Sequence, residues 1–300
     1  MQIITTIAEM REACRDLRSR HSAAAELALV PTMGAIHAGH LSLVRAARRE
    51  ASIITASLFV NPLQFGPTED LDRYPRSFDE DCRLLAEAGV DLLFAPTADA
   101  MYPTGATTLV DVPALTSRLD GASRPGHLCG VSTVVAKLFH IVQPDLALFG
   151  QKDAAQAAVI TAMVRDLNLR VRLRICPIVR DTDGLALSSR NRYLSPAERR
   201  EALVLPRTLF ATQSRIADGE TDASMLREAI LAELDAAPGI RIDYVEIVDP
   251  ATLQPVSTVT SGALIAAAIW TGSTRLIDNL LVDPTPRPAV WHPEAEVAHA

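Results

Sequence analysis

Two histidines lie three positions apart in the segment His37-Ala38-Gly39-His40. An apolar run from Leu27 to Val30 predicts a short buried strand before them, and the spacing from Leu41 onward predicts a helix after them. Pro31 and Gly34 place a turn between the two. Helix N-termini favour anions, and imidazoles there can donate to phosphate oxygens. The pattern predicts a phosphate site, although such a pair alone fits one capping and one packing histidine equally well.

Two more polar segments containing glycine follow predicted strands. The amides of Asn61 to Gly66 could hold the hydroxyls or carboxylate of a small polar ligand, and a turn around a packed Phe65 explains this segment equally well. Gly150 to Asp153 opens a helix, with Gln156 one turn further in. Lys152 opposes the dipole of that helix unless an anion offsets its charge. The segment Gly150 to Asp153 therefore predicts a phosphate contact.

A fourth segment, Leu187 to Arg192, contains two hydroxyls and two guanidinium groups, which suit an anion clamp, with a solvated linker as the alternative. Arg124 to His127 is a further candidate anion-facing turn. The chain has neither a GxxxxGK[ST] phosphate loop nor a GxGxxG fingerprint. These absences argue against a P-loop ATPase and against the usual dinucleotide-binding motif.

The elements that must position these segments alternate between strand and helix over the first 180 or so residues. Apolar patterning predicts strands at 27–30, 53–60, 90–95, 146–149 and 171–179, and helices at 7–19, 77–88, 131–142 and 154–167. We interpret Ser77 to Glu80 as a capping box that opens the second helix. The alternation predicts an α/β fold with a doubly wound, parallel, Rossmann-like sheet. Ligands bind such sheets at the carboxyl ends of the strands, where the polar segments fall.

The pattern changes after the polar turn Arg180 to Gly184. A second capping box, Ser195 to Glu198, is expected to begin a long helix, and another helix follows at 223–236. Strands are predicted at 242–248, 264–270 and 275–282. The expected organisation is a Rossmann-like domain over residues 1–183, a smaller C-terminal α+β domain over 184–282, and a disordered proline-rich tail over 283–300, with the domain boundary within Arg180 to Gly184.

Composition limits the functional class. The chain has 300 residues, of which 48% are hydrophobic and 22% charged, with a net charge of −7. This balance gives no electrostatic reason to expect nucleic acid as a partner, and the longest apolar runs are too short to span a membrane. Four cysteines without metal-ligand spacing indicate reduced thiols and a cytoplasmic location.

Six ordered segments together resemble the pantothenate synthetase (pantoate–β-alanine ligase) family. They stand in the family's order, and the resemblance extends over about residues 1–282, all but the tail. The segments are PTMGAIHAGH (31–40), FVNPLQFG (59–66), YPR (74–76), RPGH (124–127), GQKDAAQ (150–156) and LSSRNRYLS (187–195). The HxGH and Ser-Ser-Arg segments also resemble the paired motifs of nucleotidyl-transferring Rossmann proteins. The resemblance implies ATP-dependent joining of pantoate to β-alanine, which gives pantothenate, AMP and pyrophosphate, with Mg²⁺ and a homodimer. It also implies that the C-terminal domain, 184–282, closes over the site as a lid, with Asp183-Gly184 as the expected hinge.

The resemblance also assigns residues. ATP-binding positions fall on Met33, Gly34, Ala35, Ile36, His37, Ala38, Gly39, His40, Gly150, Gln151, Lys152, Asp153, Val179, Leu187, Ser188, Ser189 and Arg190. The family's catalytic histidine falls on His40, and its pantoate-holding glutamines fall on Gln64 and Gln156, with Gln64 also bordering the β-alanine position. The metal ligands are left unassigned.

The chemistry that these residues could support is carboxylate activation followed by amide formation. We expect His40, His37 and Lys152 to hold phosphate oxygens while charge is redistributed, and we count all three as catalytic. Asn61 joins Gln64 as an expected substrate-binding residue. No covalent nucleophile is needed, because an acyl phosphate is already activated.

Two alternatives remain open. A nucleotidyltransferase acting on a phosphorylated acceptor also uses HxGH and a Ser/Arg loop, but it would need more cationic groups in place of the two glutamines. An inactive binding module is the other. Gln151 stands where typical family members have glutamate, and Ala154 and Ala155 where they have bulkier residues. Formation of AMP that depends on both pantoate and β-alanine separates these hypotheses.

Overall fold

The structure is a computed structural model that describes residues 1–22, 25–67, 69–259 and 262–282. The tail for which disorder was expected, 283–300, lies outside these residues. The chain divides into two compact units, Met1–Val179 and a second that begins at Arg180. Among the helices of the described residues, none combines the length and the apolar character needed to cross a bilayer.

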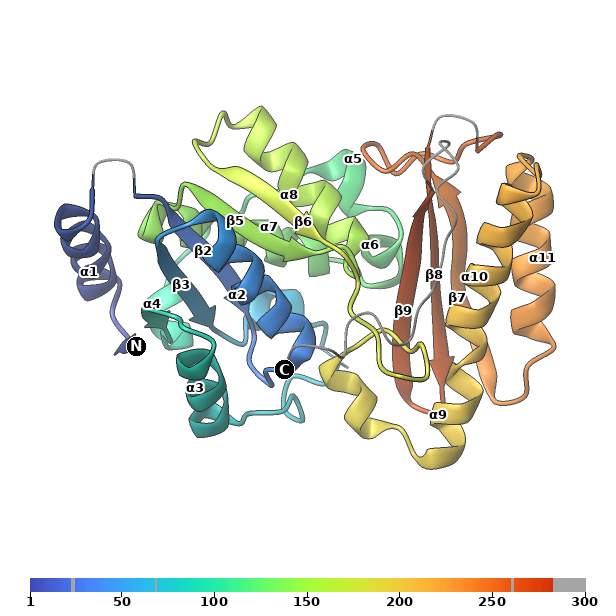
Figure 1. Ribbon diagram of the computed structural model, residues 1–300, viewed down its shortest axis with the longest axis horizontal. Helices are drawn as coiled ribbons and strands as arrows, with labels where there is room; N and C mark the ends of the chain where they lie inside the picture. The colour runs from blue at the N-terminus through green and yellow to red at the C-terminus, as the bar shows by residue number, and fades with distance from the viewer. Residues whose placement is uncertain (23–24, 68, 260–261, 283–300) are drawn as a thin grey trace. The chain divides into compact units, whose positions relative to one another are not determined.

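The first unit is built on a six-stranded parallel sheet (Figure 1). Its order is β1-β4-β3-β2-β5-β6, and every pairing is parallel. The strands are β1 Gln2–Ile4, β2 Leu27–Thr32, β3 Ile53–Leu58, β4 Leu92–Phe94, β5 Leu146–Gly150 and β6 Arg172–Cys176. This confirms the predicted α/β class. The order reverses between β2 and β5, which makes their carboxyl ends the switch point where ligands bind in such sheets.

Strand β2 shows why the sheet is covered on both faces. Leu27 and Leu29 pack into one buried cluster with helices α1 (Ile7–Arg20) and α7 (His127–Val142), whereas Ala28 and Val30 pack into another with α2 (Ala38–Glu50) and α3 (Phe78–Glu87). Alternate side chains of a strand point to opposite faces, so a continuous apolar run requires helices on both. The fully apolar run 27–30 therefore selects a central, doubly covered position.

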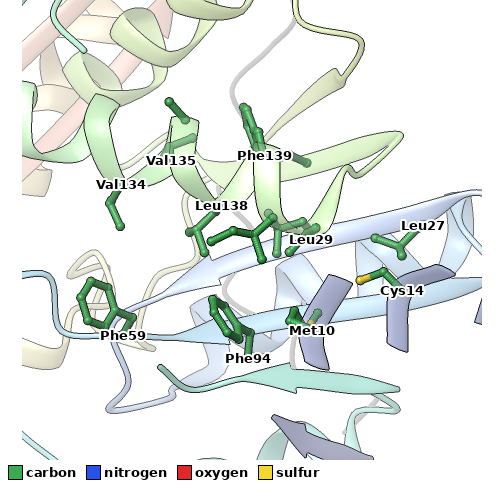
Figure 2. Close-up of a cluster of buried hydrophobic side chains, with 14 of the residues drawn as sticks. Met10, Cys14, Leu27, Leu29, Phe59, Phe94, Val134, Val135, Leu138 and Phe139 are labelled. Carbon is green, nitrogen blue, oxygen red and sulfur yellow. The ribbon is translucent and has the colours of Figure 1, made fainter. Parts of the chain in front are cut away.

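Figure 2 shows the first of these clusters, in which Leu27 and Leu29 face α7 across a set of buried side chains. The packed residues drawn there include Met10, Cys14, Phe59, Phe94, Val134, Val135, Leu138 and Phe139. Met10 and Cys14 come from α1, four positions apart on one face of the helix. The cluster fixes β2, and with it the turn that carries the two histidines.

The helices of the first unit follow the predicted pattern with some differences. They are α1 Ile7–Arg20, α2 Ala38–Glu50, α3 Phe78–Glu87, α4 Ala98–Met101, α5 Pro113–Thr116, α6 Asp120–Ser123, α7 His127–Val142 and α8 Ala154–Asp166, together with the 3₁₀ helix η1 Pro62–Gln64. Strand β1 and the one-turn helices α4, α5 and α6 were not predicted. All four are too short to show a hydrophobic period.

The predicted capping box at Ser77 is wrong, although the helix it was meant to open exists. Ser77 is the N-cap of α3 but caps no backbone amide with its side chain. Its hydroxyl instead donates to the carboxylate of Asp81, at 3.1 Å. The buried carboxylate competes successfully for this hydroxyl because charge-assisted hydrogen bonds are the stronger ones.

The second unit contains an antiparallel sheet, β7-β8-β9, with α10 and α11 beside it (Figure 1). Its elements are η2 Ser189–Tyr193, α9 Pro196–Ala202, α10 Val204–Ala217, α11 Ala223–Asp235, β7 Ile240–Val248, β8 Ala263–Thr271 and β9 Thr274–Val282. Ser195 and Glu198 form the predicted capping box with both hydrogen bonds present. The long helix expected after it is two helices, which meet at Leu203.

The second unit begins at Arg180, the first residue of the polar turn in which the boundary was expected. Arg180 forms a bidentate ion pair with Asp278 of β9, at 2.6 and 2.9 Å, and donates to the carbonyl of Gly184. Arg199 of α9 pairs with both Asp181 and Asp183. Asp183, one of the two residues of the expected hinge, is therefore tied to α9 by an ion pair. The hinge at Asp183-Gly184 stays a prediction.

Candidate active site

The turn after β2 combines backbone strain with a buried anchor. Gly34 and Ala35 both adopt positive φ, of 93° and 50°. The side chain of Asp81, which is only 1% exposed, accepts hydrogen bonds from the amides of Ala35 at 2.9 Å and Ile36 at 2.8 Å. A left-handed alanine is unfavourable by itself. The carboxylate therefore holds the turn in the conformation that delivers His37 to the helix N-terminus.

The two histidines meet at the start of α2. Their rings are stacked, with centroids 4.0 Å apart. His37 is the N-cap, and its Nδ1 accepts the amide of Gly39 at 3.1 Å. In a neutral ring the proton then resides on Nε2, which makes that atom a donor. Capping by His37 is thus real, and it orients the ring.

His40 differs from its neighbour. Its Nδ1 is buried and has no hydrogen-bond partner among the residues that the structure describes. Burial lowers the pKa of His40 to about 4; the negative charge of Asp153 offsets part of this shift, and the positive charge of Lys152 adds to it. The ring is therefore neutral at neutral pH and can donate from only one nitrogen. The charge-assisted donation expected from the sequence does not apply to His40 without an anion, since a nearby negative charge is what raises an imidazole pKa.

The segment after β5 lies beside this pair, as predicted. Asp153 and Lys152 both act electrostatically on His40, and β5 is the hydrogen-bonded neighbour of β2. Gly150 ends β5, and the amide of Gln151 donates to the carbonyl of Cys176. Asp153 is the exposed N-cap of α8. The charges of Lys152 and Asp153 thus act on His40 of the stacked pair at the switch point.

Gln156 lies in the first turn of α8 and is partly exposed. Ala154 and Ala155 precede it, and Ala155 is buried. The small side chain at Ala155 therefore packs against the interior, whereas Gln156 keeps access to solvent at the same helix end.

The segment after β3 is held firmly. Asn61 is 1% exposed, and its side chain is occupied by internal partners: Gln64, the carbonyl of Gly130, the amide of Leu63 and the hydroxyl of Tyr102. The amide nitrogen of Gln64 lies 2.7 Å from the sulfur of Met33. The structure thus brings Gln64 to the histidine turn. Asn61 is held by internal partners on both ends of its side-chain amide, and its predicted contact with a substrate stays a prediction.

Arg124 and His127 hold the segment after β3 through the backbone carbonyl of Gln64. Arg124 forms a bidentate ion pair with Glu69, at 2.7 and 2.6 Å. His127 Nδ1 lies 2.8 Å from the carbonyl of Gln64, and Arg124 Nη1 lies 3.0 Å from His127 Nε2. A carbonyl only accepts and a guanidinium only donates, so the proton of His127 is on Nδ1. The anion that this turn faces is a carboxylate of the protein itself.

The remaining predicted residues lie near the boundary between the units. Val179 is the last residue of the first unit. Leu187, Ser188, Ser189 and Arg190 belong to the second, where the hydroxyl of Ser188 caps η2 by accepting the amide of Arg190 at 3.3 Å. Among the described residues, no cluster of three or more His, Cys, Asp or Glu is arranged to hold a metal ion.

Comparison with known proteins decides the family. The model of the family described as "Pantoate-beta-alanine ligase" matches residues 2–281. The chain belongs to the pantoate–β-alanine ligase family. A pantothenate synthetase of Koribacter versatilis (strain Ellin345) is 55% identical over 282 residues, which cover 94% of this chain and 96% of that one.

Solved structures of the pantoate–β-alanine ligase family share the fold. Pantothenate synthetase of Thermus thermophilus aligns with a TM-score of 0.86 at 48% identity, over 93% of this chain and 99% of that chain. A pantoate–β-alanine ligase of Francisella tularensis aligns with a TM-score of 0.74 at 30% identity, over 95% of this chain and 100% of that chain. The latter is described as complexed with β,γ-ATP and β-alanine.

Three residues at this pantoate–β-alanine ligase site escaped the sequence analysis: Asp81, Glu69 and Tyr102. Each acts on a predicted residue through a contact between segments far apart in the chain, such as Asp81 with Ala35, 46 residues away. Periodicity cannot reveal such a partner. A usable signal for Asp81 is its position three, four and seven residues before Leu84, Leu85 and Ala88, which puts a carboxylate on the apolar side of the helix, where acidic side chains are rare unless they are paired.

Proposed function

We propose that this protein is an ATP-dependent ligase that condenses pantoate with β-alanine, giving pantothenate, AMP and pyrophosphate. The observation that carries the proposal is the stacked pair His37 and His40 at the switch point, beside Lys152 and Asp153. Family membership and the nucleotide and β-alanine in the Francisella tularensis structure support it.

In the first step, a pantoate carboxylate oxygen attacks the α-phosphorus of ATP, the bond to the bridging oxygen breaks, and pyrophosphate leaves. We assign His37 Nε2–H and an N–H of His40 to phosphate oxygens, with Lys152 as the fixed positive charge. Hydrogen-bond donors that are already in place need not reorganise when negative charge moves in the transition state. Most of the rate enhancement in such phosphoryl transfers arises from this positioning and charge stabilisation. Binding of a polyanion would raise the pKa of His40 from about 4 and strengthen its donation.

In the second step, the β-alanine amine attacks the acyl carbon of pantoyl-adenylate, the acyl–phosphate bond breaks, and AMP leaves. We assign Gln64 and Gln156 to pantoate, and Val179 and Leu187 to Arg190 to the nucleotide. The acyl-adenylate would hydrolyse in water, which gives a lid formed by the C-terminal unit a physical purpose.

Magnesium is part of the proposal as the partner of the ATP phosphates. Mg²⁺ usually keeps several waters and takes one or two protein carboxylates besides phosphate oxygens. Asp153, an exposed carboxylate that acts on His40, fits that requirement and is the residue we expect to contact it. When bound, Mg²⁺ would neutralise charge on the phosphates.

A homodimer and a cytoplasmic location complete the proposal. The dimer rests on the family resemblance and is tested by sedimentation of the purified protein. The location is supported by the free thiols of the four cysteines.

The test follows AMP and pyrophosphate with ATP, Mg²⁺ and pantoate, with and without β-alanine. We expect AMP to accumulate only when both pantoate and β-alanine are present. His40→Ala and Lys152→Ala should each slow pyrophosphate release by about 10²–10³ with the fold intact. Pyrophosphate release at the wild-type rate by either variant would refute its assigned role, and ATP binding without turnover by the wild type would refute the ligase.

A further inference from the structure

The orientation of the Gln64 side chain can be worked out from backbone groups alone. The carbonyl of Gly130 can only accept a hydrogen bond, and the amide of Leu63 can only donate one. Both contact the side chain of Asn61, at 3.0 and 3.3 Å. The Asn61 nitrogen must therefore face Gly130 and its oxygen must face Leu63.

The orientation of the Asn61 amide fixes the orientation of the Gln64 amide. The Asn61 nitrogen also lies 3.1 Å from the side chain of Gln64, so the Gln64 atom that faces it must be the acceptor Oε1. The amide nitrogen of Gln64 is left on the other side, 2.7 Å from the sulfur of Met33. A thioether is a weak acceptor, so an anionic or hydroxyl oxygen is a better partner for this NH₂ group.

Tyr102 closes the chain of hydrogen bonds. Its hydroxyl lies 2.8 Å from the Asn61 oxygen, and burial raises the pKa of the phenol, which keeps it protonated as a donor. The ring is held independently, 6.2 Å from the Phe59 ring and with Lys137 Nζ 5.6 Å from its centroid. Tyr102 follows α4, some 40 residues from Asn61 in the chain.

We propose that Tyr102 is a positioning residue that acts through Asn61 to fix the Gln64 amide with its NH₂ group toward the substrate. The inference rests on the proposed function for the identity of that substrate, pantoate, whose carboxylate and hydroxyl oxygens are acceptors. Without the phenol, the Asn61 oxygen keeps only the long contact to Leu63, and both amides gain rotational freedom. This chain of hydrogen bonds from Tyr102 through Asn61 to Gln64, the relay, therefore makes the Gln64 side chain selective for acceptor oxygens of the substrate.

The experiment compares Tyr102→Phe with wild type, because phenylalanine keeps the ring and removes only the hydroxyl. With ATP and β-alanine saturating, the KM for pantoate should rise about 3- to 10-fold, the loss of one hydrogen bond, while the KM for ATP stays unchanged. Asn61→Asp is the second variant. Its carboxylate cannot donate to Gln64, so the Gln64 amide turns over and the KM for pantoate rises about 10- to 100-fold.

Ser132→Ala is the matched control. Ser132 has a buried hydroxyl on α7 that donates to the carbonyl of Val110 at 2.6 Å, and its hydrogen-bond contacts within the described part of the chain are backbone carbonyls outside the relay. Its loss should lower thermal stability without changing the KM for pantoate. An unchanged KM for pantoate in both Tyr102→Phe and Asn61→Asp overturns the relay, as does an equal rise in the KM of all three substrates.

A measurement that needs no substrate separates this inference from the proposed function. Hydrogen exchange of the Asn61 side-chain NH₂ group, followed by NMR on ¹⁵N-labelled protein, should be at least about 3-fold faster in Tyr102→Phe than in wild type. Equal exchange overturns the relay. Absence of pantoate-dependent AMP from the wild type would refute the ligase, and the exchange rates would still decide the hydrogen-bond relay.

Discussion

Replacing Asp81 with asparagine tests whether one buried carboxylate holds the histidine turn. Asp81 accepts the amides of Ala35 and Ile36 on separate oxygens, at 2.9 and 2.8 Å, and also accepts the hydroxyl of Ser77. Asparagine has almost the same shape but only one acceptor oxygen. Its NH₂ group must then face one of the two backbone N–H groups, donor against donor.

The size of the effect follows from these contacts. One buried amide left without an acceptor costs about 1–3 kcal/mol, and the other loses its charge-assisted partner, for about 1 kcal/mol more. The turn contains a left-handed alanine, Ala35 at φ 50°, which is unfavourable by about 1–2 kcal/mol and favours rearrangement once the anchor weakens. We expect the free energy of unfolding to fall by about 2–4 kcal/mol. The KM for ATP should rise about tenfold or more, since 1.4 kcal/mol is a factor of ten.

The assay combines urea unfolding with steady-state kinetics in which ATP is varied. Asp79→Asn is the matched control, because Asp79 lies on the same first turn of α3 but is exposed. Asp79→Asn should change the free energy of unfolding by no more than about 0.5 kcal/mol, and the KM for ATP by no more than the corresponding factor of about two. If Asp81→Asn unfolds at the wild-type urea concentration and keeps the wild-type KM for ATP, the carboxylate does not hold the turn.

Three further predictions follow from the packing. His40 and His127 have pKa values of about 4 in the folded protein against 6.5 ordinarily, so the unfolded chain binds more protons between these values, and stability is lost as pH falls from about 6.5 toward 4. His40→Gln should flatten this dependence by up to about 1.4 kcal/mol per pH unit, and an unchanged slope in urea titrations contradicts the assignment. Gly130→Ala should destabilise the fold by about 1–3 kcal/mol and raise the KM for pantoate. The reason is that a Cβ at this position would clash with the backbone of Leu63 and lie 2.8 Å from the backbone nitrogen of Gln64. A wild-type stability together with a wild-type KM for pantoate would show that α7 can move away. Asp278→Ala should cost about 3–5 kcal/mol by calorimetry, since it leaves Arg180 buried without its partner, and a loss below about 1 kcal/mol would mean that water compensates.

The sequence by itself determined the layered fold and the chain positions of the candidate site. The apolar run at 27–30 required a strand covered on both faces, and alternating elements required a parallel sheet. Carboxyl ends of such strands share one edge, so His37, His40 and Lys152 could be expected to meet on the strength of the residue order alone. These inferences depend on local periodicity and on topology, which the order of residues encodes directly.

Only the tertiary structure decided what holds those residues and in which state. The neutral form of His40 depends on burial by packed elements, and the polarity of the Gln64 amide depends on the carbonyl of Gly130, 66 residues away in the chain. Ser77 donates to the carboxylate of Asp81 instead of capping a backbone amide of α3, and that carboxylate is held in place by the amides of Ala35 and Ile36 in the turn after β2. Hydrogen bonds and desolvation act over a few ångströms in space, and residue spacing along a chain does not specify which groups come that close.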